Sequence, residues 1–401
     1  GFRRGRGTPD QLFTLSQILS NATEFDTPTH TCFIDLRKAY DTVNRNALWR
    51  ILRQSGLSGK LQRLLQDLHT DTRATVKAYG QTSKPFDINN GVRQGCVLAP
   101  ALFNLFLDHV VRQALDNIDE GVTLRYTVDG ELHIKHRRPN ELLELVQILL
   151  YADDMAIVCS SSEGLTRLVT SLDNITQAWH LDISQPKTKI LSVDRNNSQQ
   201  KPAINLRGVD IENVKSFTYL GRKFSSSPSL DDEIASRLQK ASHSFWRLKS
   251  VLYSRKEIST KTKVRIFKCT VLPTLLYGAE TWAPLVRHLR RLEAFQMRCL
   301  RYILGIRFAT HGKVTNQSIR TRCNVRPITD MLRTSRLRWL GHLARMSPNR
   351  LPHKALFSRL DGDRPRGGHF STWRQQIIND LALIHQSDTW LSKATSRSEW
   401  R

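Results

Sequence analysis

Three aspartates stand at the ends of apolar runs in the first half of the chain. Asp35 follows one apolar run, and Asp153 with Asp154 lies between two others, at 148–151 and 156–158. Adjacent carboxylates at a tight turn repel each other unless a cation shares them. Three carboxylates form the oxygen-rich ligand set that Mg²⁺ prefers. They can hold two such ions about 4 Å apart, an arrangement used for phosphoryl transfer.

An aspartate pair also has a more ordinary interpretation. Aspartate is common in turns and at helix N-termini, where its side chain accepts backbone hydrogen bonds. Taken alone, the pair at 153–154 therefore favours a turn or a helix cap. The chemical interpretation becomes stronger only when the sequence blocks around it are considered together.

The elements that must position these carboxylates are predicted from the apolar pattern. A buried strand is expected over 32–36, and a hairpin over 149–158 carries the aspartate pair at its tip. Alternating runs around Asp129-Gly130 predict another hairpin, over 122–135. Helices are expected from Thr8, from Asn44, over 100–115, over 165–175 and beyond Asp231, and short strands over 74–79, over 85–88 and near Ile183, Ile190 and Phe217.

Positive charge is concentrated in the last two fifths of the chain. The 401 residues include 61 Lys and Arg against 36 Asp and Glu, a net charge of +25. Residues 1–240 hold 30 basic and 27 acidic side chains, whereas residues 241–401 hold 31 and 9. This surplus favours a polyanionic partner, most simply nucleic acid. An anionic membrane surface is also negatively charged and is the alternative. No apolar run approaches about 18 residues, so a membrane span is not expected.

The cysteines and the first residues indicate the compartment. The six cysteines are widely spaced and include no Cys-x-x-Cys pair, so a zinc ribbon has no support. Sparse thiols fit a reducing compartment, and an intracellular protein is expected. The sequence begins at Gly1 without a signal-peptide pattern. We interpret it as a piece of a longer reading frame, or as a degenerate copy of one.

Several blocks resemble, in order, those of reverse transcriptases from non-LTR (LINE-type) retrotransposons. Tyr151-Ala-Asp-Asp154 resembles the Y-x-D-D motif, and residues 33–41 resemble the first palm motif. Residues 91–104 are similar to the block that begins G-x-R-Q-G. Later similarities to the primer grip, thumb and post-thumb blocks occur at 217–221, 275–282, 298–301 and 338–342. The resemblance covers nearly the whole chain.

The resemblance implies a two-metal site. Its ligands would be Asp35, Asp153 and Asp154, with the backbone carbonyl of Leu36 as a lesser ligand. The expected cofactors are two Mg²⁺ ions, with Mn²⁺ as an alternative. One ion would lower the pKa of a primer hydroxyl, and the other would steady the pyrophosphate leaving group.

The resemblance also implies contacts with the incoming nucleotide. Tyr40 would be a steric gate that excludes a 2′-hydroxyl, while Gln94 and Gly95 would approach the template base and the nascent pair. Lys187 would lie near the triphosphate and protonate the pyrophosphate. Taken alone, Tyr40 favours a packed core tyrosine, Gly95 a turn, and Lys187 a solvated hairpin lysine, with Lys189 as its rival.

Contacts with the primer and the duplex are expected further along the chain. The primer grip would comprise Phe217, Tyr219, Leu220 and Gly221. Basic side chains on the following helices would contact the phosphates of a template–primer duplex. These are Lys240, Arg247, Lys249, Lys261, Lys263 and Arg265. The tryptophans Trp246, Trp282 and Trp339 are expected in the core instead.

The predicted fold is α+β and resembles a right-hand polymerase. Partial fingers and an antiparallel palm are expected over 1–224, a helical thumb over 225–310 and a basic helical region over 311–401. The predicted function is RNA-directed DNA polymerase, with an RNA template, a DNA primer and deoxynucleoside triphosphates as partners and no membrane. The family resemblance implies the nucleus and the cytoplasm.

Some features depart from the family pattern. An Arg-Pro-Ile-Ser-like fingers block and an upstream endonuclease are missing, and Ala99 stands where serine is usual. The alternative is therefore a truncated, catalytically inactive remnant that only binds nucleic acid. A magnesium phosphohydrolase would explain the carboxylates, but not the blocks around Gly95 and Phe217.

Overall fold

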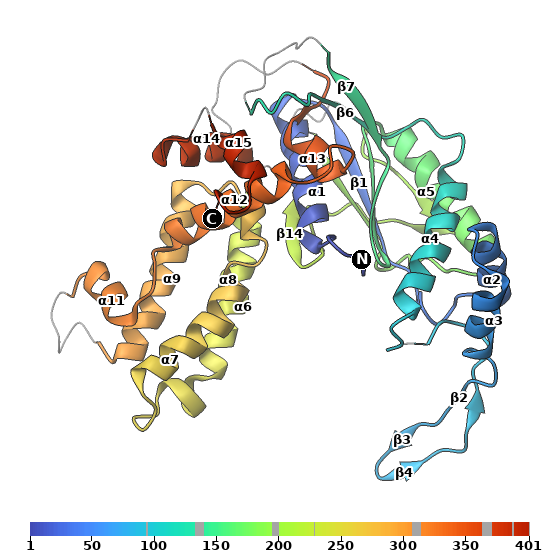
Figure 1. The fold of residues 1–401 in the computed structure, drawn as a ribbon, viewed down its shortest axis with the longest axis horizontal. Helices are drawn as coiled ribbons and strands as arrows, with labels where there is room; N and C mark the ends of the chain where they lie inside the picture. The colour runs from blue at the N-terminus through green and yellow to red at the C-terminus, as the bar shows by residue number, and fades with distance from the viewer. Residues whose placement is uncertain are drawn as a thin grey trace. The chain divides into compact units, whose positions relative to one another are not determined.

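The computed structural model describes eight stretches of the chain, which form two compact units (Figure 1). Unit 1 comprises Gly1–Gln11, Pro28–Thr123 and Leu145–Val214, and unit 2 comprises Leu12–Thr27, Leu124–Glu144 and Lys215–Arg401. The described stretches are 1–93, 95–132, 140–194, 200–227, 229–306, 314–362, 371–386 and 389–400. They mix helices and strands, which confirms the predicted class in its coarse form.

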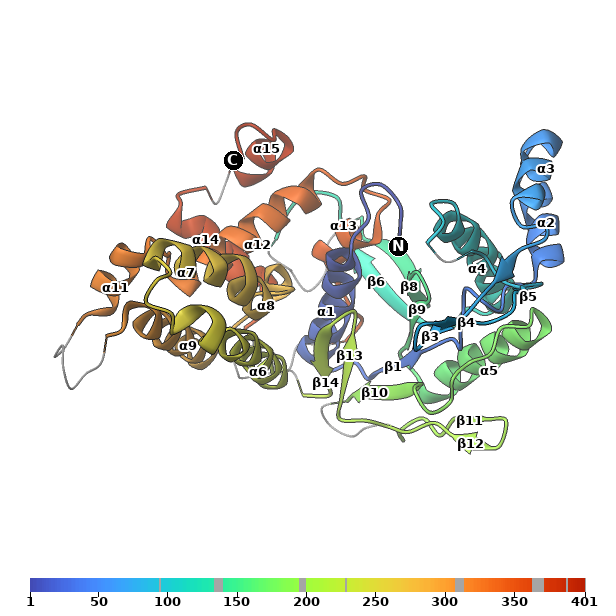
Figure 2. The same ribbon diagram turned by 90° about the horizontal axis from the view of Figure 1, so that it is seen from below.

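The centre of unit 1 is a four-stranded antiparallel sheet in the order β10-β1-β9-β8 (Figure 2). The strands are β1 (Thr29–Ile34), β8 (Ile148–Tyr151), β9 (Asp154–Cys159) and β10 (Lys189–Val193). All six residues of β1 are buried, because this strand has a neighbour on each side and helices over one face. The hairpin predicted at 149–158 is confirmed, whereas the strand predicted at 32–36 begins earlier and ends at Ile34, one residue before Asp35.

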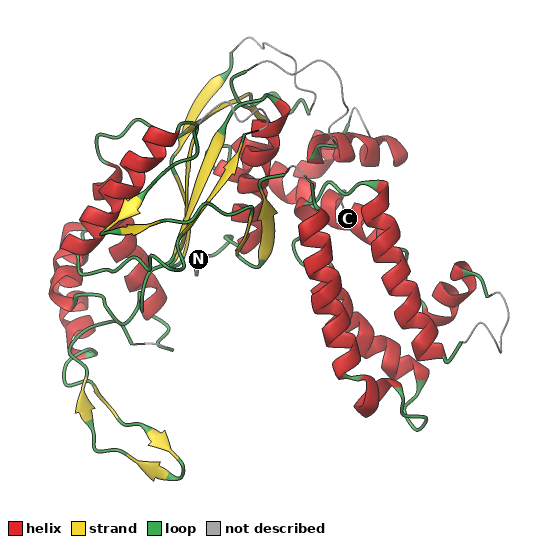
Figure 3. Ribbon diagram, turned by 180° about the vertical axis from the view of Figure 1, so that it is seen from behind, coloured by secondary structure: helices red, strands yellow, loops and turns green. Residues whose placement is uncertain are grey.

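Helices lie beside this sheet in unit 1 (Figure 3). They are α2 (Arg45–Gln54), α3 (Gly59–Asp67), α4 (Ala99–Leu115) and α5 (Ser162–Ala178). The Asn44 side chain accepts a hydrogen bond from the backbone N–H of Ala47 at 3.0 Å and so caps α2, as predicted. Apolar residues of α2, α4, α5, β1 and β9 form one buried core.

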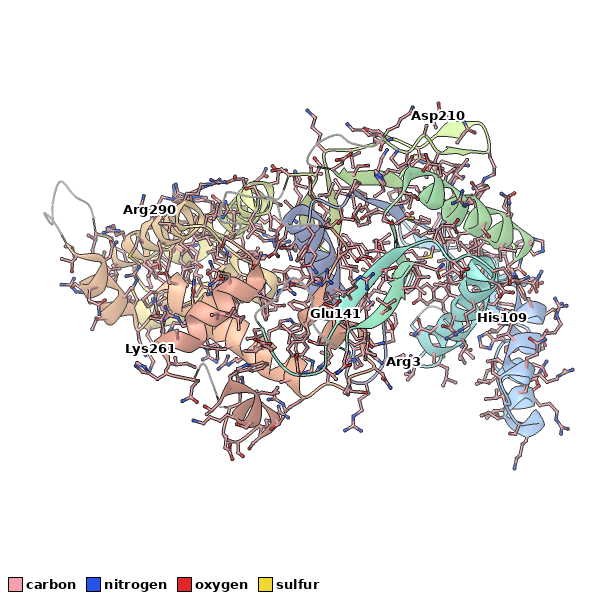
Figure 4. The ribbon with its side chains drawn as sticks, turned by 90° about the horizontal axis from the view of Figure 1, so that it is seen from above. Arg3, His109, Glu141, Asp210, Lys261 and Arg290 are labelled. Carbon is pink, nitrogen blue, oxygen red and sulfur yellow. The ribbon has the colours of Figure 1, made fainter. Side chains whose placement is uncertain are left out.

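Two small hairpins also belong to unit 1. A long ribbon follows α3 and contains β2 (Arg73–Ala74) paired with β5 (Phe86–Asp87), then β3 (Lys77–Ala78) paired with β4 (Gln81–Thr82). It extends beyond the helices of this unit (Figure 3). The second hairpin pairs β11 (Asn205–Leu206) with β12 (Val209–Asp210) and carries Asp210, labelled in Figure 4. The short strands expected near 74–79 and 85–88 are therefore present.

The hairpin predicted over 122–135 is only partly represented. Its first arm is β6 (Val122–Tyr126), whose neighbours in a three-stranded sheet are β7 (Leu142–Val146) and β15 (Ser358–Arg359). Most of the predicted second arm, residues 133–135, lies outside the described residues.

Unit 2 is mainly helical, as the pattern beyond Asp231 predicts. It contains most of α1 (Thr8–Glu24) and a β13 (Ser216–Tyr219)–β14 (Arg222–Ser225) hairpin. Its other helices are α6 (Asp231–Arg247), α7 (Thr260–Ile266), α8 (Leu272–Leu275), α9 (Val286–Leu304), α11 (Asn316–Cys323), α12 (Ile328–Ala344), α13 (Leu351–Leu356), α14 (Trp373–Leu383) and α15 (Trp390–Thr395), with π-helical turns at Lys249–Tyr253 and Phe267–Val271 and a 3₁₀ turn at Ala279–Thr281.

The described residues of unit 2 include two apolar cores. One includes buried residues from Ile234 to Leu332, and the other joins Trp339 and Trp373 to Phe13 of α1. Trp282 and Trp339 are buried, as predicted.

The prediction for Trp246 is wrong, because this side chain is 40% exposed. It lies on the solvent side of α6, where its ring meets the edge of Tyr302 at 5.2 Å between ring centroids.

Among the described helices, none is long and apolar enough to cross a bilayer.

Candidate active site

The register of the central sheet brings two of the aspartates face to face. Ile34 of β1 pairs with Met155 of β9 in an antiparallel ladder, so the next position along each strand sets Asp35 opposite Asp154. Because side chains alternate between the faces of a strand, these carboxylates lie on the opposite face from Ile34 and Met155. The latter two point into the core shared with α4 and α5.

The third aspartate is held by a tight turn. Tyr151 pairs with Asp154, which leaves Ala152 and Asp153 as a two-residue loop between β8 and β9. Ala152 has φ 57°, a left-handed conformation that suits this type of hairpin but costs a non-glycine residue about 1 kcal/mol. The turn therefore holds Asp153 and Asp154 next to each other at the end of the sheet.

Asp153 and Asp35 are close enough to Asp154 to affect its ionisation. Burial raises the pKa of Asp154, and the charges of Asp153 and Asp35 raise it further. Burial also raises the pKa of Tyr40, and the charge of Asp153 adds to that effect. Negative charge is therefore crowded at this end of the sheet, and a cation bound there would relieve the repulsion.

Lys187 approaches Asp35 from the other side of β1. The Lys187 Nζ atom lies 3.2 Å from Asp35 Oδ2, a buried oxygen with no hydrogen-bond partner among the described residues. The backbone fixes this approach, since the Ser184 N–H donates to the Asp35 carbonyl at 2.8 Å and the Lys187 N–H donates to the Ser184 carbonyl at 3.1 Å. Lys189, the rival candidate, instead pairs with Glu212 at 2.8 Å.

The carbonyl of Leu36 points toward the hairpin side of β1. Leu36 forms an antiparallel bridge with Ile183, flanked by hydrogen bonds from Ser184 N–H to the Asp35 carbonyl and from Arg37 N–H to the carbonyl of residue 182. In such a pair the central residues direct their own polar groups away from each other. The Leu36 carbonyl is thus turned to the side from which β9 and Asp154 approach.

The residues fit a divalent cation chemically, although they are not a preformed cage. Within the described stretches, no three His, Cys, Asp or Glu side chains are grouped closely enough to hold a metal ion as they stand. The donors are all oxygens, which suits Mg²⁺. Moreover, burial and the charges of Asp153 and Asp35 raise the pKa of Asp154, and a bound cation would relieve this effect.

Tyr40 is packed on a helix of the same unit. Its ring stacks on Phe103 of α4, with 4.3 Å between centroids and 24° between planes. Its Oη atom is buried and has no hydrogen-bond partner in the part of the chain that the structure describes. The ring is thus firmly supported by packing, whereas the hydroxyl forms no hydrogen bond with the described residues.

The glycine block begins with a backbone contact to the Tyr40 segment. Gly91 has φ 82°, and a Cβ atom there would lie only 2.7–2.8 Å from backbone atoms of Tyr40 and Asp41. Only glycine allows this close approach without a clash. Gly95 has φ 80° and open space where a Cβ would stand. Gln94 lies outside the described residues.

The predicted primer-grip residues form the β13–β14 hairpin of unit 2 and its turn. Tyr277 Oη donates a hydrogen bond to the Leu220 carbonyl at 2.9 Å, and the Arg237 guanidinium donates to the Gly221 carbonyl. Sequence reasoning missed Arg237. Its only local signal is Glu233 one helical turn earlier, with which it forms a buried ion pair at 2.7 Å.

The predicted duplex-binding side chains are exposed with one exception. Lys240, Arg247, Lys249, Lys261 and Arg265 are exposed on unit 2, and Lys261 is labelled in Figure 4. Lys263 is only 8% exposed. Its side chain is largely covered beside the buried Val264, and its contact with phosphates stays a prediction.

Comparison with known proteins agrees with the sequence blocks. The family model described as "Reverse transcriptase (RNA-dependent DNA polymerase)" matches residues 1–224. The RNA-directed DNA polymerase from mobile element jockey of Drosophila funebris is 26% identical over 314 residues, covering 76% of this chain and 31% of that protein. The Pol polyprotein from type-1 retrotransposable element R2 of Popillia japonica is 24% identical over 401 residues, covering 94% of this chain and 52% of that protein.

A similarity to a solved structure is weaker. The apo telomerase from Candida tropicalis matches 98% of this chain and 56% of that one at 12% identity, with a TM-score of 0.41. The chain spans about a third of the length of the jockey relatives.

Proposed function

Since this chain belongs to the reverse transcriptase (RNA-dependent DNA polymerase) family, we propose that it extends a DNA primer on an RNA template, as part of a non-LTR retrotransposon polymerase. The observation that carries this proposal is the cross-strand placement of Asp35 and Asp154, with Asp153 in the adjoining turn. The substrates and the activity belong to the proposal, because the chain covers only part of the length of its relatives.

In this proposal the three aspartates hold two divalent ions, assisted by the Leu36 carbonyl. When bound, the ions lower the pKa of the primer hydroxyl and stabilise the charge on the pyrophosphate. The Lys187 ammonium, 3.2 Å from Asp35, then has a second task. It stands beside the carboxylates, from where it can donate a proton to the leaving pyrophosphate.

The nucleotide would be selected by the surface between the sheet and α4. The Tyr40 ring is backed by Phe103, so it cannot yield to an extra 2′-hydroxyl on the incoming sugar. The open face at Gly95 leaves room for the nascent base pair. These roles are supported by packing in unit 1.

The finer architecture is also proposed. The sheet of unit 1 corresponds to the palm of a right-hand polymerase, within residues 1–224. The helical segments over 225–310 correspond to the thumb, and residues 311–401 form a basic extension. We further propose an intracellular setting, where RNA templates and reducing conditions occur together.

Primer extension on an RNA template with the full chain tests the function. The parent should add deoxynucleotides in the presence of Mg²⁺, and Asp153→Ala should not. Asp210→Ala is the matched control, because this aspartate lies on the β11–β12 hairpin of the same unit and is exposed. An intact parent that binds template–primer but extends nothing would favour the catalytically inactive remnant.

A further inference from the structure

We propose that the tip of the β3–β4 ribbon is a binding site for single-stranded RNA. Tyr79 would stack on a base, and Lys77 and Lys84 would contact the flanking phosphates. The binding site itself follows from the structure of the ribbon. Only the choice of RNA as the strand rests on the proposed function.

The ribbon contributes little to the core of unit 1. Every residue from 75 to 87 is exposed, including the apolar Val76 and Phe86, which are 57% and 48% exposed. Backbone and side-chain hydrogen bonds hold the two arms together, with Ser83 N–H donating to the Val76 carbonyl and Val76 N–H donating to Ser83 Oγ, both at 2.9 Å. The fold thus maintains an ordered ribbon whose side chains are available to a partner.

The residue at the tip is a poor choice for the fold. Ala78 pairs with Gln81, so Tyr79 and Gly80 form a two-residue loop with φ values of 50° and 80°. Turns of this type prefer asparagine, aspartate or glycine, because other side chains cost about 1–2 kcal/mol in the left-handed region. The Tyr79 side chain is fully exposed and has no ring contact or hydrogen bond among the described residues.

The second hairpin of unit 1 shows how such a cost can be offset internally. Leu206 pairs with Val209 around Arg207 and Gly208, whose φ values of 52° and 81° match those of the ribbon tip. Arg207 is held by Asp173 at 3.1 Å and by Asp182 at 2.7 Å. The same strained position therefore carries intramolecular ion pairs in one hairpin and a solvated aromatic ring in the other.

The charge of the ribbon indicates the partner. Arg73 is paired with Asp87 at 3.1 Å, whereas neither Lys77 nor Lys84 has an ion pair within the described residues. An exposed aromatic ring beside free ammonium groups is the chemistry that binds single strands, through base stacking and phosphate contacts. A-form duplexes hide their bases in a deep, narrow groove, so an unpaired RNA segment suits Tyr79 better.

Photo-crosslinking with the full chain tests this site. The probe is a single-stranded RNA that carries 4-thiouridine and a fluorescent label. Cross-links should map to residues 73–87 and not to the matched β11–β12 hairpin at 205–210. Tyr79→Ala should weaken binding at least about fivefold, as base–aromatic stacking requires, while Tyr79→Phe keeps the ring and stays within about twofold of the parent.

Tyr79→Gly separates binding from folding. Glycine accepts positive φ without strain, so this variant should unfold at the same temperature as the parent or higher, yet bind RNA as weakly as Tyr79→Ala. Equal RNA affinity in the parent and both variants would overturn the proposal and leave a protein partner as the occupant. A Tyr79→Gly chain that unfolds earlier would also overturn it, by giving the ring a structural role.

The outcome is independent of catalysis. If the parent extends a primer but the Tyr79 variants bind RNA as tightly as the parent, the inference fails and the proposed function stands. If no chain extends a primer but the cross-link and affinity depend on Tyr79, the inference stands and the proposed function fails.

Discussion

A buried ion pair in unit 2 and the crowded carboxylates of unit 1 show two opposite arrangements of charge. In unit 2, Arg336 is 4% exposed and its guanidinium lies 2.7 Å from the equally buried Asp380. In unit 1, three aspartates converge on one end of a sheet, and their mutual repulsion raises the pKa of Asp154 beyond the effect of its burial. Buried charges with matched partners have a structural role. Crowded like charges instead indicate a site where a ligand of opposite charge binds.

This contrast predicts opposite signs for the same kind of mutation. Removing Arg336 from the matched pair leaves Asp380 buried without its closest counter-charge, which destabilises the fold. Removing a charge from the crowded carboxylates relieves repulsion, so the fold gains stability while the chemistry is lost.

The largest effect is expected at the carboxylates. Asp154→Asn should lower the rate of primer extension on the order of 10³-fold, because metal-held charge contributes several kcal/mol to such a transition state. The same variant should unfold at a higher temperature than the parent in metal-free buffer at pH 7. Extension is followed on gels and unfolding by calorimetry. A variant that loses both activity and stability would break the comparison.

Breaking the matched pair should give the next largest effect. Arg336→Ala leaves the buried Asp380 with Arg333, 3.4 Å away, as its remaining counter-charge, and the free energy of unfolding should fall by about 3 kcal/mol. Urea unfolding followed by tryptophan fluorescence measures this, since Trp339 and Trp373 lie in the adjoining core. The control is Arg336→Met with Asp380→Leu, which removes both charges and should recover most of the loss. A stable single variant would contradict the architectural role.

Much of the carboxylate site could be predicted from sequence because its determinants are local. A strand that runs up to Asp35 and a hairpin that bears Asp153 and Asp154 are periodic patterns, and antiparallel pairing of these two apolar strands brings their ends together. The approach of Lys187 follows from the same ladder, since β10 lies on the other side of β1.

The exposure of individual side chains could not be predicted from sequence, because it depends on which face of a helix other elements cover. The basic residues of α7 are indistinguishable by type, yet Lys263 is largely covered while Lys261 and Arg265 are exposed. Trp246 is exposed for the same reason, since only its tertiary neighbours decide whether a tryptophan on α6 is covered. The contact of Arg237 with the Gly221 carbonyl also joins separate elements of unit 2, and no local pattern indicates it.

A bound cation should balance the negative charge of the carboxylates in unit 1, as Arg336 balances Asp380 in unit 2. Mg²⁺ at about ten times its dissociation constant should stabilise the parent by about 1.4 kcal/mol, because it binds the folded chain alone. For a chain of 401 residues we expect a rise of about 2 °C in the unfolding temperature. Asp154→Asn should show little or no rise, and the exposed control Asp210→Asn should respond like the parent. An equal response in all three would place the ion elsewhere.

The smallest expected effect is a pH dependence that isolates Asp154. Its pKa is raised above the ordinary 3.8 by burial and by Asp153 and Asp35, so the folded chain holds this proton more tightly than the unfolded chain. The resulting stabilisation is fully present below 3.8 and is lost as the pH rises through the folded pKa. Asparagine does not titrate, so the unfolding temperature of Asp154→Asn relative to the parent should increase across this interval and then level off. Mg²⁺ should reduce this final difference in unfolding temperature, because the cation neutralises the carboxylate charge of the parent. A difference that stays constant from acid to neutral pH would show that Asp154 is not the group under strain, and the contrast between the two units would then rest on Asp35 and Asp153.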